Sequence, residues 1–292
     1  MSASIPYASA SVWEHLGTDW VGQVHSKFRT SLNVEVEGLL LHIGHNPNRL
    51  SGLGMSLPQG EGGLVIEDMA IGDLVRSTSQ KVSLFPSRGL PVVYRWLDIQ
   101  KVASTVAFGS LAPQDLELLE TTLGAMRLKS RLGLDLTEEV RERLDTLVQP
   151  GAAEVDRRRA IEWLLGRGLG LTPSGDDIVA GYAFVMWANG RDVLDARLRV
   201  SARLKTTPVS ATMLHMLGFG EVSSAVMAVW NALLAHDEGA LKDALNGLLD
   251  LGHTSGIDTM YGMLLGARTV RAQNHPNAGV GGKVELFHVR GK

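Results

Sequence analysis

The sequence predicts an α+β protein whose β-rich part comes first and whose mostly helical part follows. Short apolar or alternating runs, separated by Gly, Pro, Asn and Ser, fill the first third of the chain, a pattern typical of strands and turns. From Pro113 onward, apolar residues instead recur at three- and four-residue spacing, as in amphipathic helices. We therefore expect a β-rich domain at 1–112 and a helical domain at 113–292, sizes that suit two ordinary domains.

The β-rich part is expected to form a small barrel or sandwich, because several short strands follow one another at close spacing. Residues 34–37 alternate Val, Glu, Val, Glu, as a half-buried strand does. One short helix is expected before the strands, near 11–16. The expected strands are 21–29, 32–36, 38–43, 64–67, 82–85 and 91–94.

The helical part begins at Pro113 with acidic residues in its first turn, a common start for a helix. A polar, Gly-rich connector at 273–282 and a final strand at 283–289, returning to the N-terminal sheet, are expected to end the chain. The expected helices are 113–120, 137–144, 155–165, 177–188, 194–205, 209–217, 222–235, 240–249 and 258–271.

Composition narrows the class of protein. The formal net charge is -3 and no basic stripe is present, so a nucleic-acid partner is not expected. The triplet 157–159, three arginines in a row, is typical of a solvated helix face. Cysteine is absent, and neither a secretory leader nor an apolar run of about 18 residues is evident. These features predict a protein of the cytoplasm with no membrane partner.

The most informative segment is 166–177, in which small, polar and acidic residues precede an apolar, helix-like run. A hydroxyl of Thr172 or Ser174 is expected to cap that helix. Gly170 and Gly175 permit close approach of a ligand, and the free N–H groups of a helix start favour an anion. The segment thus predicts a phosphate- or carboxylate-binding loop, although a capped helix after a glycine turn explains a single copy equally well.

Two adjacent carboxylates, Asp176 and Asp177, add a condition to this interpretation. They repel a bare anion unless a cation, a proton or an N–H donor accompanies it. A Mg²⁺ ion bound to a phosphate would meet the condition, and so would an amide NH₂ group that donates to one Asp. No dedicated metal site is predicted, and Mg²⁺ is left open as a cofactor.

The motif S-G-x-D-x-x-x-G occurs twice and shifts the balance toward a ligand site. It begins at Ser174 and again at Ser255, where Gly256 and Asp258 follow. The last motif position in each copy is a glycine, Gly181 and Gly262, and small residues there would let two helices pack closely. We expect the two helix starts to converge on one small polar ligand.

Three further residues are weighed beside the repeated motif. His253 precedes the second copy and is a candidate acid or base near neutral pH. Thr207 lies in the hydroxyl-rich segment 206–212, which stands at the start of another apolar helix and is expected to supply plain N-capping. Glu221 is interpreted as a first-turn helix charge in preference to a further acid of the site.

The segments 170–177 and 252–258, with the softer segments 22–28 and 207–210, resemble a bacterial family known as domain-of-unknown-function family 2877. That family includes a subunit of the oxamate carbamoyltransferase of anaerobic allantoin breakdown, an enzyme that needs further subunits. The resemblance implies a reaction between carbamoyl phosphate and oxamate that gives oxalurate and phosphate. It implies a small anionic substrate and partner subunits.

The resulting prediction is a subunit of a carbamoyltransferase-type enzyme acting on carbamoyl phosphate and a small acid amide. The alternative is a non-catalytic subunit that binds a small anion or a nucleotide, or that assembles a multisubunit metabolic complex. His253, Asp177 and Asp258 are the candidate catalytic residues. The candidate substrate- or phosphate-binding residues are Gly170, Thr172, Ser174, Gly175, Asp176, Ser255 and Gly256.

Overall fold

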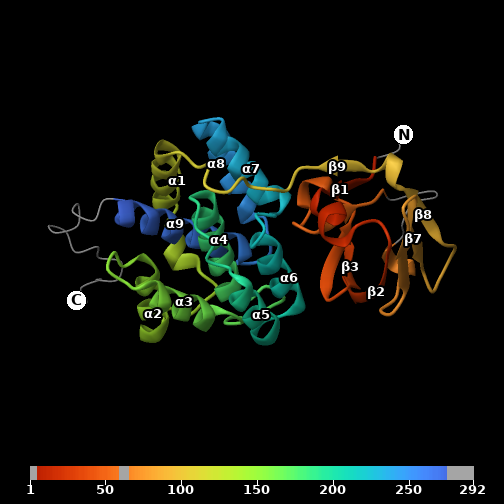
Figure 1. Cartoon of the computed structure of the whole chain (residues 1–292), viewed down its shortest axis with the longest axis horizontal. Helices are drawn as coiled ribbons and strands as arrows, with labels where there is room; N and C mark the ends of the chain where they lie inside the picture. The colour runs from red at the N-terminus through yellow and green to blue at the C-terminus, as the bar shows by residue number, and fades with distance from the viewer. Residues whose placement is uncertain (1–4, 59–65, 275–292) are drawn as a thin grey trace. The chain divides into compact units, whose positions relative to one another are not determined.

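A computed structural model describes residues 5–58 and 66–274 of the chain, which divides into two compact units (Figure 1). The first unit comprises Met1–Val106 together with Phe219–Met227, and the second comprises Ala107–Gly218 together with Ala228–Lys292. The first unit is therefore discontinuous in sequence, because the chain returns to it briefly from the helical unit. The strand expected at 283–289 and most of the connector before it lie outside the described residues.

The first unit is built on one curled sheet of nine strands, which confirms the α+β prediction (Figure 1). Its strand order is β8-β7-β6-β2-β3-β4-β5-β1-β9. The pairs β4–β5 and β1–β9 are parallel, and the other neighbours are antiparallel. The strands are β1 Tyr7–Ser9, β2 Trp20–Lys27, β3 Ser31–Val36, β4 Leu39–Gly44, β5 Gly54–Ser56, β6 Leu74–Ser77, β7 Lys81–Phe85, β8 Val92–Arg95 and β9 Gln100–Val102.

Most of the expected elements of this unit are present. A one-turn helix, Val12–Leu16, stands where one was expected near 11–16. The strand expected at 64–67 is wrong at its described end, because Ile66–Asp68 forms a 3-10 turn. The strands that the sequence pattern missed have only three or four residues, too few to show a clear alternation.

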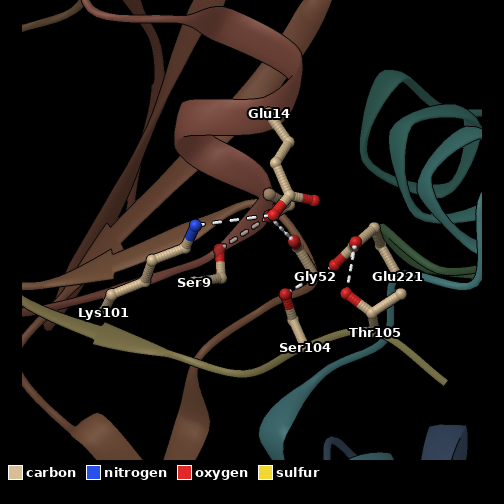
Figure 2. A network of polar contacts seen from close by, with 8 residues as sticks. Ser9, Glu14, Gly52, Lys101, Ser104, Thr105 and Glu221 are labelled. Carbon is tan, nitrogen blue, oxygen red and sulfur yellow. Dashed lines mark hydrogen bonds and ion pairs between the residues drawn. The ribbon is translucent and has the colours of Figure 1, made fainter.

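Glu221 fastens the returning segment to the first unit (Figure 2). Its side chain is buried, and its two carboxylate oxygens accept hydrogen bonds from the hydroxyls of Ser104 at 2.5 Å and Thr105 at 2.9 Å. A β-bridge joins Thr105 to Glu221 as well. Since Glu221 precedes the first turn of the next helix, its interpretation as a helix-start charge is wrong, and its role is to hold this segment.

The second unit is helical, as expected, and each helix expected from the sequence overlaps an observed one. In the described chain no helix combines the length and the apolarity that crossing a bilayer requires. The helices are α1 Pro113–Ala125, α2 Glu138–Val148, α3 Glu154–Leu164, α4 Ser174–Ala188, α5 Ala196–Lys205, α6 Pro208–Leu217, α7 Ser224–Leu234, α8 Glu238–Leu249 and α9 Ser255–Asn274. The first turn of α7 belongs to the first unit.

Helices α4 and α9 form the centre of this unit (Figure 1). A Cβ atom added at Gly181 would overlap the carbonyl oxygen of Thr259, and one added at Gly262 would overlap that of Ile178. The two backbones therefore touch through the last glycine of each motif copy, which confirms the expected close packing. Helices α1, α2 and α8 pack on α9, and α3 and α6 pack on α4, so the central pair is buried on most sides.

Candidate functional site

The first turns of α4 and α9 bring together hydroxyl and carboxyl groups from both copies of the motif. The two helices run in the same direction, since residues near their starts meet and residues further along also meet. We call the resulting group the hydroxyl–carboxylate cluster. It consists of Thr172, Ser174, Asp177, Thr254, Ser255 and Asp258.

Each serine of the cluster serves the aspartate of the other helix. The Ser255 hydroxyl lies close enough to the carboxyl of Asp177 to lower its pKa, and the Ser174 hydroxyl has the same effect on Asp258. The hydroxyls of Thr172 and Ser255 lie 2.9 Å apart and join the two helix starts directly. The sequence predicted that the two starts converge, and the structure places them in one site.

The two carboxyl groups form the buried floor of the cluster. Asp177 is 3% exposed and Asp258 is fully buried, whereas Thr172, Thr254 and Ser255 are half-buried. One oxygen of each carboxyl group, Oδ2, has no hydrogen-bond partner among the described residues. A buried polar atom without a partner is costly, so both oxygens are suited to receive donors from a ligand.

Burial also sets the protonation of these groups. It raises the pKa of Asp177 to about 8; hydrogen bonds from Ser255 and Thr172 oppose the rise, and the Asp258 carboxyl adds to it. Burial raises the pKa of Asp258 too, against hydrogen bonds from Gly133, Ser174 and Thr254. At neutral pH Asp177 is therefore mostly protonated, and its carboxyl group can both donate and accept.

Gly133 closes one side of the cluster from the loop between α1 and α2. Its N–H donates to Asp258 Oδ1 at 3.0 Å. A Cβ atom at this position would overlap the hydroxyl oxygens of Ser174 and Thr254 and would lie 3.0 Å from Asp258 Oδ2. Neither Gly133 nor Thr254 was expected in the site, and the local sequence around Gly133 carries no motif that would have identified it.

The helix starts differ from the expected anion loop. The N-cap of α4 is Pro173, which makes no side-chain capping bond, so the expected capping by Thr172 or Ser174 is wrong. The N–H of Gly175 donates to the Arg167 carbonyl at 2.7 Å, and that of Gly256 to the Leu251 carbonyl at 3.2 Å. Those two amides are occupied within the protein.

Both glycines instead allow close packing. A Cβ atom at Gly175 would overlap the carbonyl oxygen of Leu164 at the end of α3, and one at Gly256 would overlap that of Leu248 at the end of α8. A glycine in the first turn thus lets each central helix pack directly against the end of the helix that precedes it.

The remaining candidates are not members of the cluster. Asp176 is buried and accepts hydrogen bonds from the N–H of Gly166 at 2.7 Å and from the Thr206 hydroxyl, so it braces the loop before α6. Gly170 is exposed, with open space around it and a positive φ of 95°. His253 is exposed in the loop before α9. Thr207 caps α6 by accepting from the Ser210 N–H, as expected.

The cluster is suited to a small ligand that carries both donors and acceptors. Two unpartnered carboxyl oxygens can accept from an NH₂ group, while hydroxyls and a protonated Asp177 can donate to carbonyl or carboxylate oxygens. No group of three or more His, Cys, Asp or Glu side chains that would hold a metal ion occurs within residues 5–58 and 66–274.

Comparison with known proteins identifies one family over the central helices. The model of the family described as "Oxamate carbamoyltransferase subunit AllH" matches residues 164–267. The match contains both copies of the repeated motif, and it confirms the resemblance inferred from those motifs. Gly133 and the nine-stranded sheet lie outside it. No solved structure gives a significant match to this chain.

Proposed function

We propose that this chain is a subunit of a carbamoyltransferase-type enzyme and that the hydroxyl–carboxylate cluster binds its small amide-bearing substrate. Carbamoyl phosphate and oxamate both carry an NH₂ group beside a carbonyl and an anionic group. The observation that carries the proposal is the pair of buried Oδ2 atoms of Asp177 and Asp258, which have no hydrogen-bond partner in the described part of the chain. The family match over both motif copies supports the reaction class.

In the proposed reaction the nitrogen of the acid amide attacks the carbonyl carbon of carbamoyl phosphate. The carbon becomes tetrahedral, phosphate leaves with the bonding electron pair, and the attacking nitrogen loses a proton. Hydroxyl groups directed at the developing oxyanion would supply much of the rate enhancement. Asp177 and Asp258 would orient the NH₂ groups, and no covalent nucleophile is required. His253, exposed beside the second motif copy, is our candidate for the proton transfer.

The test is turnover by the assembled enzyme, measured as phosphate-dependent cleavage of oxalurate with the partner subunits present. Asp177→Asn and Ser174→Ala should each lower kcat by about 10²-fold or more, because a group aimed at the reacting atoms contributes on that order. Asp243→Asn, an exposed carboxylate on α8, is the matched control and should leave the rate unchanged. Normal turnover in both cluster variants, with their folds intact, would contradict the proposed roles.

A non-catalytic assembly subunit is the second candidate, supported by the word "subunit" in the matched family's description. It predicts that activity requires this chain yet survives every cluster substitution. Thermal protection separates the two directly. Carbamoyl phosphate should raise the Tm of the chain if the cluster binds substrate, and the shift should disappear in Asp177→Asn. Adding Mg²⁺ or EDTA in parallel shows whether a metal ion takes part.

A further inference from the structure

A second polar site lies in the helical unit, outside the hydroxyl–carboxylate cluster. It is a cavity of about 360 Å³ bounded by α3, α4, the segment after α4 and the last turn of α9. Three arginines and one tyrosine line it: Arg157, Arg158, Arg191 and Tyr182. We call it the arginine cavity. None of its lining residues belongs to the cluster.

Arg157 is a buried cation without a carboxylate partner in the described chain. It is 8% exposed, although the arginine triplet was expected to lie on a solvated helix face. Its guanidinium donates to the carbonyl oxygens of Leu147 at 3.1 Å, Ala152 at 2.9 Å and Gln149 at 2.6 Å. These bonds fix its plane and hold its charge at the carbonyl end of α2, a favourable position for a cation. They use three of the five guanidinium N–H groups, so two more can donate to a ligand.

The other charged groups of the cavity differ in pairing and exposure. Arg191 donates to the side-chain oxygen of Gln273 and has no ion pair among the described residues, whereas Arg158 is paired with Asp195. Two acids, Glu154 and Asp192, also line the cavity, but both are exposed to solvent, which screens their charge.

The Tyr182 hydroxyl is a buried donor that no described group satisfies with good geometry. The residue is fully buried on α4, and its hydroxyl oxygen lacks a hydrogen-bond partner among the described residues. The neighbouring Thr269 hydroxyl directs its own proton to the carbonyl of Leu147 or Leu265. Burial raises the pKa of Tyr182, while the nearby Thr269 hydroxyl and then the charges of Arg157 and Arg191 act in the opposite direction.

We infer that the arginine cavity is a second ligand site, which binds a small metabolite through a carboxylate or phosphate group held by Arg157, Arg191 and the Tyr182 hydroxyl. Guanidinium groups recognise both kinds of oxyanion through paired N–H donors. The volume lies at the lower end of the range for ligand pockets, about 300–1,000 Å³. Ile161 and Met186 add an apolar wall for the remainder of the ligand.

The test measures the affinity of the full chain for two probes, inorganic phosphate and oxalate, by isothermal titration calorimetry. Arg191→Gln should lower the affinity for the probe that binds by about tenfold or more, as expected for loss of a charged hydrogen bond. Tyr182→Phe should lower it by about fivefold, as expected for loss of a neutral one. Arg159→Gln, an exposed arginine on the same helix, is the matched control and should leave the affinity unchanged. The probe that responds identifies the class of oxyanion.

Three outcomes would overturn the inference. The first is that neither probe binds, and the second is that Arg159→Gln weakens binding as much as Arg191→Gln, which indicates a general charge effect. The third is that Asp177→Asn, not Arg191→Gln, abolishes binding, which would locate the anion in the cluster. The thermal stability of Tyr182→Phe is a separate check. A Tm equal to or above that of the parent chain supports the inference, whereas a large fall would show that the hydroxyl has a structural partner and would contradict the role given to Tyr182. Loss of turnover in Asp177→Asn with unchanged probe affinity separates this site from the proposed catalytic one.

Discussion

At the scale of single residues, the candidate site is built on two carboxyl groups that the fold buries away from water. Asp177 and Asp258 occupy the same motif position on two helices. Each carboxyl group has the serine of the other helix beside it, Ser255 for Asp177 and Ser174 for Asp258. The sequence identified these residues because the motif repeats. It could not identify Gly133, whose contribution depends on a loop distant in the chain.

Asp177 should make folding stability depend on pH. Its folded pKa of about 8 lies above the ordinary value of 3.8, so between these limits the folded chain binds one more proton than the unfolded chain. The contribution is fully present below the unfolded pKa and is lost as pH rises through the folded one, with a steepest slope of about 1.4 kcal/mol per pH unit.

Urea denaturation from pH 5 to 9 measures this effect. Asp177→Asn should flatten the fall in the free energy of unfolding, and Asp243→Asn should keep the parent profile. An identical slope in the parent and in Asp177→Asn would show that Asp177 is ionised at neutral pH.

At the scale of secondary-structure elements, glycines decide how closely the helices approach. The spacing of apolar residues predicted the helices of the second unit, and small residues in the repeated motif predicted their close packing. The capping prediction held for Thr207 and failed for Thr172 and Ser174, whose hydroxyls turn toward the facing helix. The prediction that the arginine triplet lies on a solvated helix face also held only in part, since Arg159 is exposed while Arg157 is buried.

Substitution of Gly262 tests the contact between α4 and α9. Gly262→Ala should destabilise the chain by about 3 kcal/mol or more, because its methyl group would overlap the Ile178 carbonyl and force the helices apart. Gly247→Ala on α8 is the matched control. Apart from its own helical turn, no atom of the described residues lies within 4 Å of its added Cβ, so the change should stabilise the helix by about 0.5–1 kcal/mol. Similar midpoints of thermal unfolding for the two variants would contradict the proposed backbone contact.

At the scale of the whole molecule, the chain order does not match the order of its compact units. The sequence pattern correctly predicted a β-rich part followed by a helical part. It could not show that Phe219–Met227 returns to the first unit. That return depends on hydrogen bonds between Glu221 and the hydroxyls of Ser104 and Thr105 (Figure 2).

Removing the carboxylate of Glu221 should loosen this attachment. Glu221→Ala leaves the hydroxyl of buried Ser104 without its acceptor and should lower the free energy of unfolding by about 1–3 kcal/mol. Hydrogen exchange of the returning segment should rise at the same time. Glu14→Ala, a change at an exposed ion pair with Lys101, should alter stability by less than about 1 kcal/mol. Unchanged exchange in Glu221→Ala would show that other contacts hold the segment.

The sequence by itself determined the α+β class, the helices and the repeated Ser-Gly-x-Asp motif, because these depend on local periodicity and on residue types at fixed spacing. Only the tertiary structure decided which hydroxyl meets which carboxyl, that Gly175 and Gly256 serve packing, and that Arg157 lines a cavity. The physical reason is that burial and hydrogen-bond partners are properties of elements brought together from distant parts of the chain. Pairing of α4 with α9 turned two copies of one motif into a single site.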